Sequence, residues 1–204
     1  MRIRQHVNPL KSNFFQIALE PLELPAGARL EVELGSAEAH FLMDRAAEDP
    51  NRLYVGVEIR RDHVAQANAV CARQGLMQVR SVFANISVDL PRLFPPGRVS
   101  RFFLYFPDPW WKARRQKRRI ISPALAAEMS GLLVEGGEIY VATDVFDIAL
   151  DAMAALEGGP AQRFVNLREP WTFLRASPFA ARSRRERQCE TAGIHIWRLG
   201  YRKV

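Results

Sequence analysis

The amino-acid sequence predicts an α/β fold, a doubly wound and mostly parallel sheet with an antiparallel C-terminal strand. Two observations predict it. From residue 29 to residue 156, apolar segments of strand length alternate with segments whose apolar residues recur at helical spacing. Beyond residue 160 the alternation stops, and two strand-like segments separated by a basic cluster follow, which we expect to pair antiparallel. In such a sheet, ligands bind beyond the carboxyl ends of the parallel strands.

Strands are assigned to short runs rich in apolar, β-branched or aromatic residues, and helices to stretches with apolar residues three or four apart. The expected strands are residues 29–34, 53–59, 79–83, 102–106 and 138–143, followed by the closing strands 161–167 and 194–201. The expected helices are residues 37–48, 62–74, 123–133 and 144–156, with a short helical or looped crossing at 85–93.

Glycine, proline and a capping acid set the ends of these elements. Gly35 ends the first strand, Asp62 is a candidate cap for the second helix, and Gly75 lies just past that helix. Pro123 lies in the first turn of a later helix, where its missing N–H is not needed. The stretch 135–137 (Glu-Gly-Gly) is expected to stop that helix before the next strand.

Composition places the chain among single globular domains. Its 204 residues are 48% hydrophobic and 25% charged, so we expect one domain over residues 1–204, with residues 1–29 as an irregular arm. The sequence has no apolar run of membrane-spanning length and no signal-peptide pattern, so a cytoplasmic protein without membrane contact is expected. Cys71 and Cys189 are far apart and show no metal-ligand spacing, which favours two reduced thiols and no metal. Monomer and homodimer both remain open.

Basic residues gather in two clusters, and the net charge is +7. The first cluster comprises Lys112, Arg114, Arg115, Lys117, Arg118 and Arg119, and the second Arg182, Arg184, Arg185 and Arg187. A charge run is usually only a solvated face. Because Trp110, Trp111 and Trp171 flank these clusters, a nucleic-acid partner is favoured instead.

Each predicted parallel strand ends in a polar residue where this fold binds its ligands. These residues are Glu33, Glu58, Asn85, Asp108, and Thr143 with Asp144. Glu58 follows Gly35 by 23 residues, near the spacing at which an acid meets a ribose in nucleotide-binding folds. For Glu58 alone, a helix cap or solvated acid is an equally good interpretation.

The turn after the first strand reads Gly35-Ser36-Ala37-Glu38-Ala39. A loop that cradles pyrophosphate would read GxGxxG and would not carry an acid. A pyrophosphate would meet Glu33 and Glu38 here, so like charge disfavours NAD and FAD. An adenosyl ligand with a cationic sulfur and an ammonium group would be attracted to the same acids.

Asp108 lies between Pro107 and Pro109, directly after the strand at 102–106. The two prolines restrict the backbone of Asp108, so its carboxylate is held in a narrow range. Acid, indole and cation together suit a nucleobase, because the carboxylate accepts base N–H groups, the ring stacks and the cations meet phosphates. Phe102, Phe103 and Phe106 are expected to be core residues rather than a stacking surface.

The segment PDPWWKARRQKRR resembles the signature of the bacterial tRNA (guanine-N7)-methyltransferases of the TrmB type, a class I methyltransferase family with a Rossmann-like fold. Shared positions include Pro107, Asp108, Pro109, Trp110, Lys112, Arg114, Lys117, Arg118 and Arg119. The resemblance extends over about residues 28–202, through Glu33 and Gly35, Glu58, Asn85, Thr143-Asp144, and the stretch Ser183 to Glu186 with Gly193.

This resemblance implies transfer of a methyl group from S-adenosylmethionine to N7 of guanine 46 in the tRNA variable loop. The implied contacts of the cofactor are Glu33, Gly35, Glu58, Asn85 and Asp108. The implied contacts of the RNA are Lys112, Asp144, Ser183, Arg184, Arg185 and Glu186. Guanine N7 has a lone pair and no proton, so the reaction needs alignment more than a base. Asp108 is therefore expected to act as a positioning acceptor for guanine N–H groups.

The sequence departs from the family pattern at several positions. Ala37 and Ala39 replace glycines of the first turn, and Ser183 and Arg185 replace a threonine and an aromatic residue. Two alternatives therefore stay open. One is a non-catalytic or weakly active RNA-binding relative with an impaired cofactor site, and the other is a methyltransferase that acts on another RNA or a small substrate.

Overall fold

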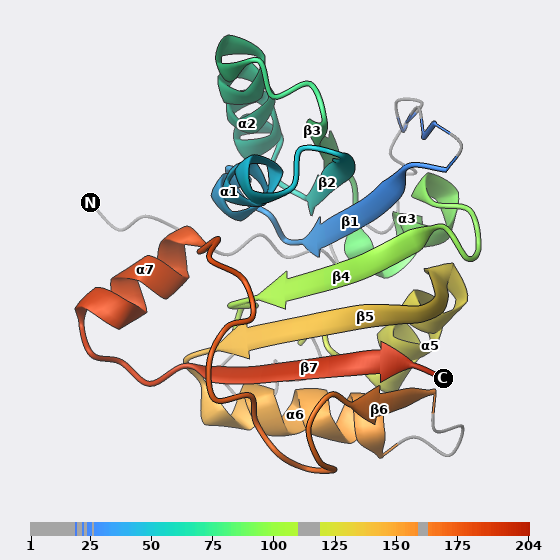
Figure 1. The fold of residues 1–204 in the computed structure, drawn as a ribbon, viewed down its shortest axis with the longest axis vertical. Helices are drawn as coiled ribbons and strands as arrows, with labels where there is room; N and C mark the ends of the chain where they lie inside the picture. Colours follow the sequence, from blue (N-terminus) through green and yellow to red (C-terminus); the bar gives the residue numbers. More distant parts are fainter. Residues whose placement is uncertain (1–18, 20–21, 23, 26, 110–118, 159–162) are drawn as a thin grey trace.

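The computed structural model describes residues 19, 22, 24–25, 27–109, 119–158 and 163–204 (Figure 1). Its strands are β1 Arg29–Leu34, β2 Arg52–Glu58, β3 Val79–Phe83, β4 Val99–Tyr105, β5 Leu133–Thr143, β6 Phe164–Asn166 and β7 Trp197–Lys203. Its helices are α1 His40–Glu48, α2 Arg61–Gln74, α3 Ile86–Leu93, α5 Pro123–Leu132, α6 Phe146–Glu157 and α7 Arg184–Thr191. None of the described helices is long and apolar enough to cross a membrane.

The strands form one sheet in the order β3-β2-β1-β4-β5-β7-β6. The pairs from β3 to β5 are all parallel, whereas β7 runs antiparallel to both β5 and β6. The predicted mostly parallel sheet with antiparallel closing strands is therefore confirmed. The carboxyl ends of β1, β4 and β5 point to one edge of the sheet, and α7 lies at that edge (Figure 1).

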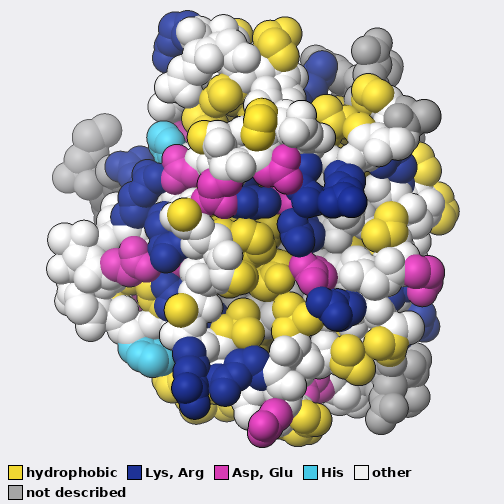
Figure 2. Space-filling view, in the orientation of Figure 1, with side chains coloured by type: hydrophobic (Ala, Val, Ile, Leu, Met, Phe, Trp, Pro, Cys, Tyr) yellow, Lys and Arg dark blue, Asp and Glu magenta, His cyan; other side chains and the backbone are white. Residues whose placement is uncertain are grey.

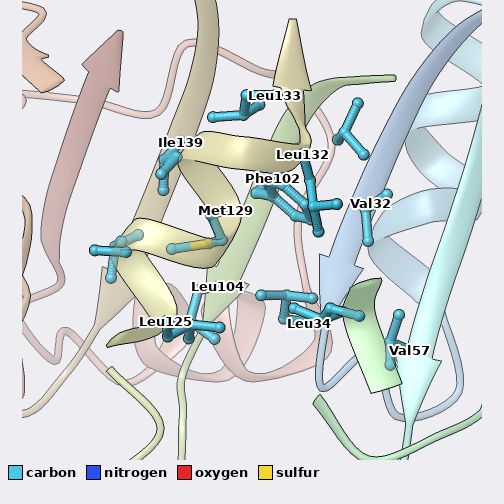
Figure 3. Packing of buried hydrophobic residues seen from close by; sticks show 14 of the residues in the cluster. Val32, Leu34, Val57, Phe102, Leu104, Leu125, Met129, Leu132, Leu133 and Ile139 are labelled. Carbon is cyan, nitrogen blue, oxygen red and sulfur yellow. The ribbon is translucent and has the colours of Figure 1, made fainter. Parts of the chain in front are cut away.

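Both faces of the parallel strands are buried, as is usual when helices cover a sheet on either side. Phe102 and Leu104 of β4 pack with Leu125 and Met129 of α5 on one face (Figure 3). Phe103, one residue along β4, points to the opposite face and joins the cluster that α1 and α2 cover. The prediction that Phe102 and Phe103 are core residues is confirmed, since both are fully buried. Phe106 is half-buried at the margin of a smaller cluster.

A network of ion pairs spans the face of the sheet that α1 covers. The fully buried carboxylate of Glu31 in β1 accepts Arg45 at 3.1 Å and Arg101 at 2.7 Å, and Arg52 lies 3.4 Å away. Arg101 also reaches Glu138 of β5 at 2.9 Å. Figure 2 shows acidic and basic side chains side by side in a band across this face of the molecule. The Glu31 carboxylate thus joins α1, β1, β2 and β4, and Glu138 extends the network to β5.

The starts of α1 and β5 differ from the prediction. Helix α1 begins at His40 rather than at residue 37, because Ala37 and Ala39 adopt positive φ. Strand β5 begins at Leu133, directly after α5, and runs through the glycines expected to separate helix from strand. Gly136 takes a φ of 71°, and the β4–β5 register shifts between Val99 and Arg101, so the strand passes this point with an irregularity.

Other details also differ. The N-cap of α2 is Arg60, and Asp62 lies in the first turn instead of capping the helix. Residues 85–93, left open between helix and loop, contain α3 with Asn85 as its N-cap. The expected strand at 161–167 is shorter, as β6 covers Phe164–Asn166, and the sequence reasoning missed α7 altogether.

Candidate cofactor and substrate site

The turn between β1 and α1 has left-handed backbone at three positions. Gly35, Ala37 and Ala39 have φ of 81°, 46° and 57°. The N–H of Gly35 donates to the carbonyl of Val57 at 2.8 Å, and the N–H of Ala39 donates to the carbonyl of Ser36 at 2.7 Å. The alanines thus hold a conformation that usually favours glycine. The methyl group of Ala39 is fully buried in the core cluster under α1, while Ala37 is half-buried.

Ser36 in this turn packs directly against β2. A side-chain carbon added at Gly56 would lie 2.3 Å from Ser36 Oγ, so only glycine fits there. Ser36 Oγ is buried and has no hydrogen-bond partner among the described residues. A glycine inside a strand often marks such a close approach, and this signal was available in the sequence.

Glu33 at the end of β1 is a buried carboxylate with an unmatched oxygen. The residue is 4% exposed, and its Oε2 has no hydrogen-bond partner in the described part of the chain. Burial, and secondarily the negative charge of Glu58, raise the pKa of Glu33 well above its ordinary value. A buried acid without a partner is costly, and a bound cation relieves that cost. The ammonium group of S-adenosylmethionine fits this chemistry.

Glu58 at the end of β2 organises the same turn. Its Oε2 accepts the N–H of Ala37 at 2.9 Å, and its Oε1 accepts the N–H and the Nε of Arg60 at 2.9 and 3.1 Å. The carboxylate therefore joins the turn after β1 to the start of α2. It is neither a solvated acid nor an N-cap, because it is 3% exposed and Arg60 holds the cap position. Arg60, which the sequence reasoning did not single out, lies against the acid expected to contact the ribose.

Asn85 follows β3 and caps α3. Its Oδ1 accepts the N–H of Ser87 at 3.0 Å, and its own N–H donates to Asp89 Oδ2 at 2.8 Å. Ala84, just before it, donates its N–H to the carbonyl of Glu58 at 3.1 Å. Asn85 is therefore buried beside the strand end that carries Glu58, on the side of the sheet edge expected for the cofactor.

Asp108 follows a sharp change of direction at the end of β4. Phe106 has a φ of 48°, and its N–H donates to the carbonyl of Ala142 at 2.7 Å, after which the chain leaves the sheet. Asp108 is exposed beyond this point. Arg119 turns back toward this loop, with its Nε donating to the carbonyl of Pro109 at 3.1 Å and its Nη1 to Asp151 at 2.5 Å.

Much of the first basic cluster lies outside the described residues. This applies to Lys112, expected to contact RNA, to Trp110 and Trp111, and to Arg114, Arg115, Lys117 and Arg118. Arg119 is the member that the structure describes, and it is mostly buried by its contacts with the protein.

Helix α7 brings the expected RNA-contacting residues to the edge where the parallel strands end. Asp144, just past β5, accepts Arg185 of α7 at 2.6 Å. Ser183 is the N-cap of α7, and its Oγ accepts the N–H of Glu186 at 3.1 Å. Glu186 is 2% exposed and accepts Arg198 of β7 at 2.8 Å, so it anchors the helix and does not face solvent. The S-x-x-E pattern at 183–186 is the sequence signature of a helix N-terminus and could have predicted this helix.

The remaining arginines of the second cluster face acids from other elements. Arg187 pairs with Asp44 of α1, and Arg184 lies 3.9 Å from Glu38 in the first turn. In the orientation of Figure 1, Figure 2 shows basic side chains beside acidic ones where α7 approaches the strands. The cluster is thus neither a bare basic patch nor a simple solvated face. It joins α7 to the turn expected to hold the cofactor.

Among the described residues, no group of three or more His, Cys, Asp or Glu side chains is arranged to hold a metal ion. Cys71 and Cys189 are free and buried. Glu58 and Asp144 at the strand ends are instead matched by arginines, and Glu33 keeps one carboxylate oxygen without a hydrogen-bond partner among the described residues.

A family model, Methyltransf_4, described as "Putative methyltransferase", matches residues 28–199. A tRNA (guanine-N(7)-)-methyltransferase of Synechococcus sp. (strain JA-3-3Ab) is 37% identical over 205 residues, which are 97% of this chain and 84% of the relative. The chain therefore belongs to the tRNA (guanine-N(7)-)-methyltransferase family.

A second relative, the tRNA (guanine-N(7)-)-methyltransferase of Anaeromyxobacter dehalogenans (strain 2CP-C), is also 37% identical, over 85% of each chain. Among solved structures, the 16S rRNA methyltransferase KamB matches with a TM-score of 0.61 at 14% identity, covering 86% of this chain and 88% of its own. The aminoglycoside resistance methyltransferase NpmB1 matches with a TM-score of 0.58 at 15% identity, over 86% of this chain and 87% of its own. At these identities the two structures support the fold of this methyltransferase.

Proposed function

We propose that this methyltransferase transfers the methyl group of S-adenosylmethionine to N7 of guanine in tRNA, at position 46 of the variable loop. The relatives that carry the tRNA (guanine-N(7)-)-methyltransferase name support the reaction. The structural observation that carries the proposal is the buried carboxylate of Glu33 beside the left-handed turn at Gly35–Ala39, because its Oε2 has no hydrogen-bond partner in the described part of the chain. Both lie at the edge of the sheet where this fold binds its ligands. A tRNA substrate also agrees with a cytoplasmic protein.

In this proposal, residues at different strand ends bind different parts of the cofactor. Glu33 holds the ammonium group of the cofactor, and Glu58 supports the turn and meets the ribose after Arg60 gives up part of its contact. Asn85 borders the adenine side. When bound, S-adenosylmethionine supplies an electrophilic methyl group on a cationic sulfur.

The chain's own residues then align the guanine. N7 already has an available lone pair, so a proton does not have to be removed before attack. The rate enhancement therefore depends mainly on the alignment of the two reactants. Asp108 accepts the N–H groups of the base and fixes its orientation. Arg185 keeps Asp144 in place at 2.6 Å, and Arg184, largely exposed, is available to the RNA backbone.

The alternative of a binding protein without activity rests on the glycine-poor first turn. The positive φ of Ala37 and Ala39 supports the active assignment, because the backbone keeps the form expected of a glycine-rich turn. The buried methyl group of Ala39 points into the core, so it does not narrow the cofactor side.

The test uses the whole protein, methyl-labelled S-adenosylmethionine and an unmodified tRNA transcript. We expect label at N7 of guanine 46, detected by strand cleavage at the modified base, and no label in a transcript with adenine at that position. Asp108→Asn should reduce turnover strongly, and by a larger factor than it reduces cofactor affinity measured by calorimetry. Cofactor binding with no N7 methylation would contradict the assigned reaction, and tRNA binding without cofactor binding would favour the inactive relative.

A further inference from the structure

Four aromatic side chains meet at the edge of the sheet next to Asp144. Trp197, the first residue of β7, lies opposite Thr143, the last residue of β5. Its ring centroid is 4.7 Å from that of Phe146, 4.8 Å from that of Phe173 and 4.2 Å from that of His195. We refer to Phe146, Phe173, His195 and Trp197 as the aromatic surface.

Phe173 packs against the core cluster, whereas the other three members of the aromatic surface lie outside it. Phe146 is 45% exposed and His195 is exposed, while Trp197 and Phe173 are half-buried. The buried side of α6 is formed by other residues, among them Ile148, Ala149, Ala152 and Met153. Leu150, one turn after Phe146, is likewise 44% exposed, which places both on the outward side of the helix. Exposed rings grouped in this way mark a binding surface more often than scattered ones do.

Cations border the Phe173 side of the aromatic surface. Arg168 Nη1 donates to the carbonyl of Phe173 at 3.2 Å, and Arg175, two residues further on, is exposed. On the Phe146 side, Arg185 holds Asp144, and Asp147 is exposed. Glu169, next to Arg168, is exposed as well, so the Phe173 side has two arginines and one acid, whereas Asp147 is the exposed charge beside Phe146. Phosphate is therefore favoured near Phe173 over Phe146. Ring faces with cations on one side match a nucleotide, whose base stacks while its phosphate meets arginine.

We propose that the aromatic surface stacks an unpaired nucleobase of the RNA substrate, adjacent to the guanine that is methylated. This inference rests on the proposed function, because the base belongs to the same tRNA. The location supports it, since Phe146 is two residues from Asp144, an expected RNA contact. The surface would hold the RNA in register while Asp108 and the cofactor meet the reacting base.

The test compares Phe146→Leu, which keeps an apolar side chain, with Phe146→Trp, which keeps an aromatic face. Val165→Ala is the matched control, because Val165 is 48% exposed but lies in β6, outside the aromatic surface. We expect Phe146→Leu to weaken binding of the tRNA transcript, measured by filter binding, and to raise its KM by about tenfold, the usual order for loss of one stacked base. Phe146→Trp and Val165→Ala should match the wild type, and the calorimetric affinity for S-adenosylmethionine should be unchanged in all three.

Equal tRNA binding by wild type and Phe146→Leu would overturn this inference while leaving the proposed function intact. A wild-type protein that binds tRNA but fails to methylate it would contradict the proposed function, and the binding comparison would still test the surface. Analytical sedimentation tests whether a second copy of the chain occupies the aromatic surface instead of RNA. If wild type dimerises and Phe146→Leu does not, the surface is a contact between two copies of the chain and the inference is wrong.

Discussion

Replacing Ala37 by glycine should make the protein more stable, although glycine usually destabilises. A left-handed backbone costs an ordinary residue about 1–2 kcal/mol, and the φ of Ala37 is 46°. Glycine removes that cost, but its unfolded chain is more flexible, so folding loses about 0.5–1 kcal/mol more in conformational entropy. Because Ala37 is half-buried, little packing is lost, and the net gain is about 0.5–1 kcal/mol. For a chain of this size the melting temperature should rise by about 1–4 °C.

Two neighbouring positions serve as internal controls in the same calorimetric scans. Ala39→Gly should change the melting temperature little, since it relieves a φ of 57° but removes a fully buried methyl group worth about 0.8 kcal/mol. Gly35→Ala should lower it by about 1–4 °C through backbone strain alone, because no atom of the described residues lies within 4 Å of the added carbon. A lower melting temperature for Ala37→Gly, or equal gains at residues 37 and 39, would refute the reasoning.

Three further predictions follow from buried or paired charges. The pKa of Glu33 is raised in the folded protein, so its contribution to stability is present below the ordinary pKa of 4.5 and is lost as pH rises through the folded pKa. Glu33→Gln should therefore stabilise the cofactor-free protein by about 1 kcal/mol at pH 7 and give no gain at pH 4, as measured by urea unfolding. The same variant should bind S-adenosylmethionine at least about tenfold more weakly by calorimetry, since about 1.4 kcal/mol of charge attraction is lost; tighter binding would contradict the role given to Glu33. Glu31→Gln removes the carboxylate that three arginines share, and should cost about 3–5 kcal/mol in urea unfolding. Arg185→Ala breaks a half-exposed pair with Asp144 and should cost under about 1 kcal/mol in the same measurement, while kcat/KM for tRNA falls by about tenfold or more; an unchanged kcat/KM would remove Arg185 from the substrate site.

The sheet could be predicted because its signals are local. Apolar alternation and the glycine after β1 give the strands and their order in the chain, and the strand-end positions of Glu33 and Glu58 follow from them. The start of α1 could not be predicted in this way. Alanine favours helices, so nothing local shows that Ala37 and Ala39 are held in left-handed turns by contacts with β2 and with Ser36.

The pairing of the second basic cluster depends on contacts between residues far apart in sequence. Arg185 meets Asp144 across 41 residues, and Arg187 meets Asp44 across 143. The run of arginines shows in the sequence how many cations are present, but it does not show which acidic residues the fold places beside them. The burial of Glu186 has the same origin, because Arg198 reaches it only once β7 has joined the sheet. The roles of Glu33, Glu58, Asn85 and Asp108 toward the cofactor remain predictions.

The position of β7 between β5 and β6 has a consequence for synthesis. The parallel strands are made first, yet β7 is the one described strand with which β6 pairs, and α7 is anchored to β7 through Glu186. In the growing chain β5 therefore keeps an open edge until residues 197–203 have left the ribosome. The cofactor turn can form early, whereas the side expected to meet RNA is assembled last. A nascent methyltransferase should thus be unable to capture tRNA at its site before that segment has emerged.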